Sequence, residues 1–222
     1  MDRIRRPSFY ALALLVGSLL VGVAGIVHPQ LAGDGAAQLG AIAASSAWRS
    51  IHWSLLFGFV WVITGLMGVL GRHVTNPGAM PARAAAFMAV FGYGCLAILV
   101  LFMTGTGWAL AQAYTRSDAG LTATRAVFLF DMLHPFGLAA ARVGAFAIGI
   151  ATYAFGWAVR NGGVYPRWLG YLGIGAGLGG MAAALAFPES SPNVLAGVAA
   201  ATAWQFAMAV AMLVERPAPS EA

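Results

Sequence analysis

Long, uninterrupted apolar runs separated by short polar segments dominate the chain. Each run covers about 19 to 28 residues, and the apolar residues are continuous instead of alternating with polar ones. A helix needs about 20 apolar residues to cross the hydrocarbon core of a bilayer, whereas the strands of a membrane β-barrel would alternate. The pattern therefore predicts an all-α integral membrane bundle of six transmembrane helices, at residues 9–27, 51–70, 83–110, 136–159, 169–187 and 194–214.

Polar, proline and glycine residues mark the ends of these helices. Ser8 is a candidate N-cap for the first helix, and His28-Pro29 ends it because proline disfavours helical geometry in the preceding residue. The glycines of Arg160-Asn161-Gly162-Gly163 end the fourth helix. Residues 121–133 form either a short surface helix or an extension of the fourth helix, since Pro135 would kink or break the chain there.

Two longer connections separate the first four helices. Residues 30–50 form the first, and the small apolar residues 36–48 within it are expected to lie along the membrane interface with Trp48 at headgroup level. Residues 111–124 form the second. The stretch Thr104–Gly107 just before it is expected to distort the end of the third helix.

Composition supports lipid as the solvent of this chain. Of its 222 residues 60% are hydrophobic and 9% are charged, and the mean hydropathy is +0.80. Soluble domains carry about 25% charged residues. We expect one transmembrane domain over residues 1–216 and a disordered, proline-containing tail at 217–222. The basic residues are scattered singly instead of clustered, so we expect no nucleic-acid partner.

The distribution of the twelve basic residues, all arginine, predicts the orientation in the membrane. Arginine-rich ends lie in the cytoplasm. Both termini are therefore expected to be cytoplasmic, because one side of the predicted bundle holds Arg3, Arg5, Arg6, Arg72, Arg83, Arg160, Arg167 and Arg216, and the other holds Arg49, Arg116 and Arg125.

Three histidines and one acid fall at the predicted outer ends of the helices. Asp131 and His134 are three residues apart and share a helix face. Together with His28 and His52 they offer nitrogen and oxygen ligands for a Zn site, and a pair of these histidines is also the ligand type that haem iron takes. The competing interpretation is that each histidine contacts headgroups or loop carbonyls, and under it no cofactor is expected.

Arg142 is the one charged residue well inside a predicted helix. It lies about 27 Å along that helix from Arg160, near the outer edge of the hydrocarbon. Either its guanidinium reaches out to the headgroups, or it faces inward and binds a lipid phosphate, a carboxylate or an anionic substrate.

Two interleaved small-residue motifs occupy the fifth predicted helix. Gly173 and Gly177 form one, and Gly175 and Gly179 form the other, and such spacing lets helices approach closely. We expect these glycines to pack against a neighbouring helix of the chain, and to offer a face for a membrane partner or a second copy.

Two segments carry a resemblance to a known family. The run from Tyr165-Pro-Arg-Trp-Leu-Gly170 into the glycine-rich fifth helix, and Phe130-Asp131-x-x-His134 before the fourth, resemble bacterial multi-span proteins of the DUF4386 type. The resemblance implies six helices, a long first outer loop and a place in the bacterial cytoplasmic (inner) membrane. It brings no established activity.

Three functions remain open from the sequence. The favoured one is a non-enzymatic accessory or structural bundle, because no high-specificity catalytic motif is present. The second is a metal-dependent membrane enzyme, such as a lipid hydrolase, that uses the outer histidines and Asp131. The third is a carrier or sensor of an anionic small molecule that uses Arg142.

Overall fold

The computed structural model describes residues 8–116, 120–188 and 191–214, and nearly all of them are helical. The tail at 217–222 lies outside these residues. In chain order the elements are α1 (Phe9–Val27), α2 (Gly35–Ala44), α3 (Trp48–Gly71), α4 (Ala79–Phe102), the π-helix η1 (Met103–Gly107), α5 (Trp108–Arg116), α6 (Gly120–Gly162), α7 (Arg167–Ala186), the 3₁₀-helix η2 (Pro192–Leu195) and α8 (Ala196–Val214).

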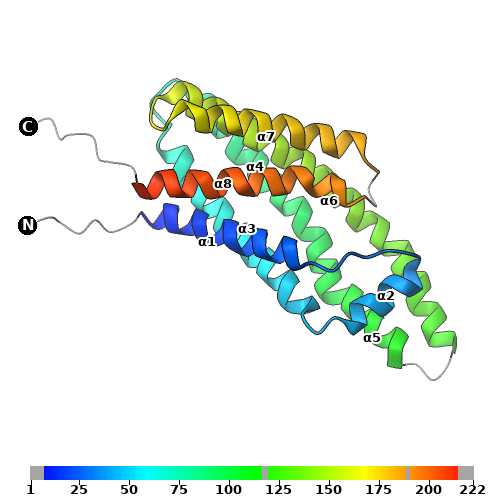
Figure 1. Cartoon of the computed structure of the whole chain (residues 1–222). Coiled ribbons are helices and arrows are strands. Elements are labelled where there is room, and N and C mark those ends of the chain that lie inside the picture. The colour runs from blue at the N-terminus through cyan, green and yellow to red at the C-terminus, as the bar shows by residue number, and fades with distance from the viewer. Residues whose placement is uncertain (1–7, 117–119, 189–190, 215–222) are drawn as a thin grey trace, which may run out of the picture.

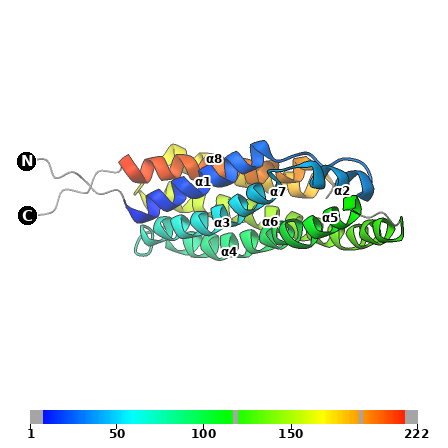
Figure 2. The same cartoon turned by 90° about the horizontal axis from the view of Figure 1, so that it is seen from below.

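The described residues contain six helical segments that are long and apolar enough to cross a membrane. Their order follows the prediction, and the first begins after Ser8 and ends before His28 as expected. We call the end of the bundle where α1 begins and α8 ends the terminal end, and the opposite end, where α2 and α5 lie, the α2 end (Figure 1). Figure 2 shows the same arrangement from below.

The third segment is longer than predicted. It runs from Ala79 to Arg116 as α4, η1 and α5, so the loop expected from residue 111 is wrong for residues 111–116. The expected distortion at Thr104–Gly107 is confirmed, because η1 is π-helical over Met103–Gly107. A π-helical turn inserts one residue into the helix without ending it, which explains why the glycines do not stop the segment.

The fourth segment, α6, is one helix of 43 residues with Pro135 inside it. Of the two alternatives for residues 121–133, the extension is therefore confirmed. The helix is about 65 Å long, against a hydrocarbon core of about 30 Å. Its N-terminal part reaches the α2 end together with α2 and α5, beyond the ends of α1 and α8 (Figures 1 and 2).

Small residues let the long helix α6 pack closely between α4 and α7. A methyl group on Gly144 would lie 2.6 Å from the carbonyl oxygen of Gly92 in α4. One on Gly149 would lie 3.0 Å from the carbonyl oxygen of Gly177 in α7. Backbones this close gain van der Waals contact that lipid cannot replace, which is the main attraction between helices in a bilayer.

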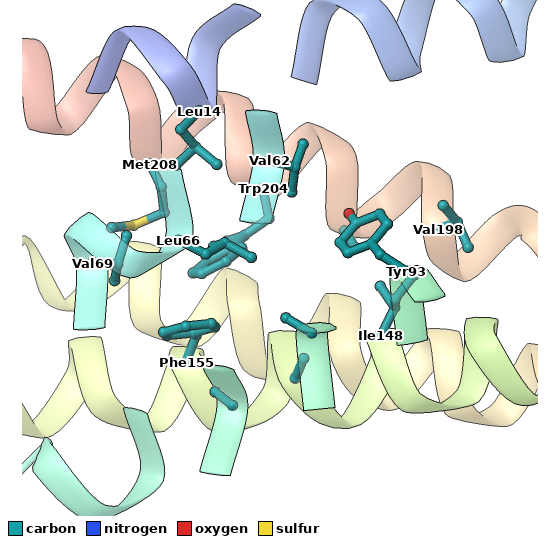
Figure 3. Packing of buried hydrophobic residues seen from close by; sticks show 14 of the residues in the cluster. Leu14, Val62, Leu66, Val69, Tyr93, Ile148, Phe155, Val198, Trp204 and Met208 are labelled. Carbon is teal, nitrogen blue, oxygen red and sulfur yellow. The ribbon is translucent and has the colours of Figure 1, made fainter. Parts of the chain in front are cut away.

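Polar side chains in the core are paired between helices. The hydroxyl of Tyr93 in α4 and the side-chain amide of Gln205 in α8 exchange hydrogen bonds of 3.0 and 2.9 Å. The indole of Trp204 donates to the carbonyl of Leu169 at 2.9 Å and stacks on Phe155 (Figure 3). Such pairs satisfy groups that would be costly unpaired in hydrocarbon.

The two glycine motifs of α7 lie on different faces. Gly173 contacts Gly156 and Trp204, and Gly177 contacts the backbone of α6, as expected of packing positions. A methyl group on Gly175 or Gly179 would meet no atom of the described chain within 4 Å. The expected contact with a neighbouring helix is therefore not found for these two glycines among the described residues, and a role for them in contact with another chain stays a prediction.

Candidate functional site

A second apolar cluster builds the α2 end of the bundle. Helix α2 begins with Asp34 as its N-cap, whose carboxylate accepts a hydrogen bond of 2.9 Å from the amide of Ala37. Its apolar side chains then pack on α3, η1, α5 and α6, in a cluster whose buried members are Leu39, Ile42, Trp48, Met103, Ala111, Ala126 and Phe130. Three of the four histidines, His28, His52 and His134, contact aromatic members of this cluster.

His28 and His52 face each other with their Nε2 atoms 3.3 Å apart. His28 follows the last residue of α1 and is half-buried, while His52 lies in the first turns of α3 and is only 2% exposed. They come together because α1 and α3 pack along each other, although 24 residues separate them in sequence. The sequence predicted both as ligands, and the structure brings these two together.

Trp48 fixes the orientation of this pair. Its ring packs on both imidazoles, with centroids 5.3 Å from His28 and 4.3 Å from His52. His52 Nδ1 donates a hydrogen bond of 2.7 Å to the Trp48 carbonyl, since a carbonyl can only accept. In neutral His52, Nε2 is therefore the nitrogen with a free lone pair, and that lone pair is directed at His28.

Trp48 is in turn held by the π-helix. Its indole Nε1 donates to the carbonyl of Met103 across 3.0 Å, and the side chain is fully buried. Trp48 therefore contacts protein and not headgroups, and its expected depth in a membrane stays a prediction. The acceptor is the first residue of η1, and the donor is the first residue of α3. Such single-turn π-helices are frequent at functional sites.

The geometry of the pair suits a shared metal ion. Two nitrogens bound at about 2.0–2.1 Å to one tetrahedral ion lie about 3.3–3.4 Å apart, which is the separation of the two Nε2 atoms. Histidines that bind metals commonly donate their other ring N–H to a backbone carbonyl or carboxylate, as His52 does to Trp48. A direct N–H···N bond between the rings would be long, since most nitrogen donors lie about 2.7–3.2 Å from their acceptor.

Burial also favours the neutral form of His28 that a metal requires. It lowers the pKa of His28 below its ordinary value by disfavouring the charged imidazolium, and a hydrogen bond to the Pro29 backbone opposes that effect. The Pro29 backbone has a carbonyl and no N–H, so His28 is the donor there.

Asp131 and His134 lie apart from the histidine pair. The ring of His134 packs on Phe130 and Phe102, at centroid distances of 4.6 and 6.2 Å. The Asp131 carboxylate lies against Gly35, where a methyl group would fall 2.8 Å from its Cγ atom. It therefore sits at the start of α2, where the helix dipole favours a negative charge.

The four predicted ligands are thus split into a pair and two separate side chains. In residues 8–116, 120–188 and 191–214, no group of three or more His, Cys, Asp or Glu side chains is arranged to hold a metal ion. Among the described residues, further ligands of a site at His28 and His52 would therefore be water or backbone carbonyls.

Arg142 of α6 contacts the C-terminal end of α7, a contact that the sequence analysis did not predict. Its Nε donates to the carbonyl of Ala184 at 2.7 Å, and its Nη2 donates to that of Leu185 at 3.2 Å. These carbonyls belong to the last turn of α7, whose oxygens have no partner within the helix. Arg142 of α6 therefore caps α7, by an interaction that spans 42 residues of sequence.

The fourth histidine, His73, is fully buried at the terminal end. Its Nδ1 donates to the carbonyl of Val69 at 2.8 Å, and its Nε2 has no hydrogen-bond partner among the described residues. Arg160 and Arg167 also meet at this end, beside one hollow. The sequence singled out these arginines only as markers of orientation.

Comparison with protein-family models, with curated proteins and with solved structures gives no match. The resemblance to DUF4386-type proteins stays a prediction.

Proposed function

We propose that this chain is a non-enzymatic membrane protein that binds a transition metal ion between His28 and His52. The observation that carries the proposal is the 3.3 Å separation of the two Nε2 atoms. The hydrogen bond from His52 to Trp48 supports it, because it leaves the His52 lone pair directed into the space between the rings.

The ion would be one that imidazole binds well, and Zn²⁺ is the probe of choice. Catalytic zinc centres commonly use three protein ligands and one water. Two histidines suit a more exchangeable ion, as in sensing, carrying or holding α1 against α3. The proposal keeps the non-enzymatic bundle favoured from the sequence but departs from its expectation of no cofactor.

The test compares the full-length protein, purified in detergent and stripped with a chelator, with two variants. Zn²⁺ is expected to raise the unfolding temperature of the parent. At a hundred times its Kd, the ion adds about 2.7 kcal/mol to the free energy of unfolding. His28→Gln removes one ligand from a half-buried position and abolishes the response. His134→Gln, a matched change at the same end outside the pair, retains it.

Metal analysis of the protein as purified gives a second readout. About one equivalent in the parent and in His134→Gln, but not in His28→Gln, supports the site. A parent that does not respond to Zn²⁺, or a His28→Gln variant that responds as the parent does, refutes the proposal.

We further propose that the protein lies in a bacterial cytoplasmic membrane with both termini in the cytoplasm. The excess of arginines at the terminal end supports this orientation, and the resemblance to DUF4386-type proteins supports the compartment. A green fluorescent protein fused after Ala222 is expected to fluoresce, and an alkaline phosphatase fused there to stay inactive. The opposite pair of results would place the C-terminus outside the cytoplasm and the histidine pair, at the other end of the bundle, on the cytoplasmic side.

A further inference from the structure

A hollow of about 240 Å³ opens at the terminal end, between the last turn of α6 and the first turn of α7. Its lining residues are Arg160, Asn161, Arg167 and Tyr171, which bring two guanidinium groups, an amide and a phenol, and no carboxylate. The tight return from α6 to α7 places these residues together, and it passes through Gly163 at a φ of +71°. The hollow thus gathers hydrogen-bond donors and positive charge.

Arg160 is held in place by aromatic rings. Its guanidinium carbon lies 4.7 Å from the ring centre of Trp157 and 5.2 Å from that of Tyr171. The Tyr171 hydroxyl also accepts a hydrogen bond from this guanidinium. The N–H groups that remain are the ones that can bind an anion. A preoriented guanidinium loses less side-chain entropy when it binds.

Arg167 adds a second charge at a place that already favours anions. It is the first residue of α7, and no side chain caps the amides of this helix end. The start of a helix carries a partial positive charge and unpaired N–H groups. The side chain of Arg167 is exposed, so its charge is available to a ligand in the hollow.

We propose that this hollow binds the phosphate group of an anionic phospholipid. The chemistry of two arginines beside a helix start selects a phosphate, since guanidinium groups match its geometry. This site is separate from the histidine pair, which lies at the other end of the bundle, and neither depends on the other.

The surroundings of the hollow favour a lipid as the source of that phosphate. Trp168 and Tyr171 are 56% and 57% exposed. Tryptophan and tyrosine are the residue types enriched at headgroup level in membrane proteins. Further along α7, Leu172 and Leu178 are about half exposed and apolar. A lipid with its phosphate in the hollow would lay its acyl chains along this face. Basic pockets at the cytoplasmic side of transmembrane helices are known to hold such headgroups.

The test measures binding of phosphatidylglycerol and phosphatidylcholine to the full-length protein in mild detergent, by native mass spectrometry and by unfolding temperature. Phosphatidylglycerol is expected to bind and stabilise the parent more than phosphatidylcholine does. Arg167→Gln weakens phosphatidylglycerol binding about five-fold, as expected for one basic residue near an anionic headgroup. Arg167→Lys recovers part of the loss.

Arg83→Gln is the matched control. Arg83 is an exposed arginine near the start of α4 at the same end, outside the lining of the hollow. An equal loss in Arg83→Gln, or equal binding of the two lipids by the parent, would overturn the proposal, because binding would then follow the overall charge of this end. Stabilisation by inorganic phosphate alone, lost in Arg167→Gln, would support the phosphate site and assign it to a free anion.

Discussion

The indole of Trp48 donates a hydrogen bond to the carbonyl of Met103 across 3.0 Å and so joins the first turn of α3 to the π-helix of the third segment. The carbonyl of the same Trp48 accepts from His52, which faces His28. One buried residue therefore couples the irregular turn to the histidine pair. A flat, fully buried ring whose indole N–H has a partner is well suited to fix two imidazoles in one orientation.

Trp48→Phe is expected to destabilise the protein by about 1–3 kcal/mol, because it removes the buried hydrogen bond to the Met103 carbonyl and shortens a fully buried side chain. The same change loosens the packing on His28 and His52, so Zn²⁺ binding weakens as well. Unfolding temperature and Zn²⁺ titration in detergent measure the two effects. Trp53→Phe is the control, since Trp53 is 41% exposed. If both variants lose the same stability, the bond to Met103 contributes little.

The lowered pKa of His28 predicts a loss of stability in acid. In metal-free protein the folded state keeps His28 neutral, while the unfolded chain takes up a proton near the ordinary value of about 6.5. The free energy of unfolding therefore falls as the pH drops from about 6.5, and it levels off once the pH passes the pKa of the folded state.

Unfolding temperatures in the presence of a chelator, at pH values from about 7.5 down to about 5, measure this effect. His28→Gln has no imidazole at this position, so its stability is expected to fall less over the same interval. A variant that loses as much stability as the parent between the two pH values would assign the acid sensitivity to other groups.

Gly177→Val and Gly175→Val form a matched pair on one helix. A side chain at Gly177 would collide with the backbone of α6, with its first carbon 2.6 Å from the Gly149 carbonyl oxygen. Overpacking of this kind costs about 1–3 kcal/mol or more. At Gly175 nothing of the described chain lies within 4 Å, so the same change is expected to leave the stability of the single chain nearly unaltered.

Size-exclusion chromatography of the same pair tests the outward face. If Gly175 packs on a second copy, Gly175→Val lowers the oligomeric state while Gly177→Val lowers the unfolding temperature. A larger loss of stability from Gly175→Val than from Gly177→Val, in a protein that stays monomeric throughout, would contradict the placement of these two faces.

The six segments and their order follow from the sequence because each apolar run is long enough to form one continuous helix, which satisfies its own backbone hydrogen bonds. Their lengths do not follow as well. Pro135 and the stretch Thr104–Gly107 are signals that end helices in water, yet α6 continues through the first, and a π-helical turn accommodates the second. Packing against neighbouring helices keeps such segments helical. This packing cannot be predicted from the local sequence.

The candidate site follows from the sequence only in part. Residue type and position at helix ends singled out His28, His52, Asp131 and His134. Which of them meet depends on the packing of α1 on α3 and of α2 on α6, and these contacts are long-range. Trp48 was assigned to the headgroups because tryptophan prefers the interface. Its burial follows from a hydrogen bond to a residue 55 positions away.

Arg142→Gln tests whether this arginine is a cap or a ligand-binding group. Its two hydrogen bonds to Ala184 and Leu185 satisfy carbonyls at the end of α7, where a positive charge is favourable. Removing the charge is expected to cost about 1–3 kcal/mol, mainly through the bond to the carbonyl of Ala184, which is buried, whereas Leu185 is exposed. Unfolding temperature in detergent measures the loss.

Arg125→Gln is the control for this change, because Arg125 lies on the same helix and is exposed. If Arg142 caps α7, Arg142→Gln is less stable than Arg125→Gln in ligand-free detergent. Loss of the cap also speeds hydrogen exchange at the residues just before Phe187. If the two variants are equally stable and exchange alike, the bonds to α7 do not hold that helix end. Arg142 would then be available to an anion, as the sequence alone allowed.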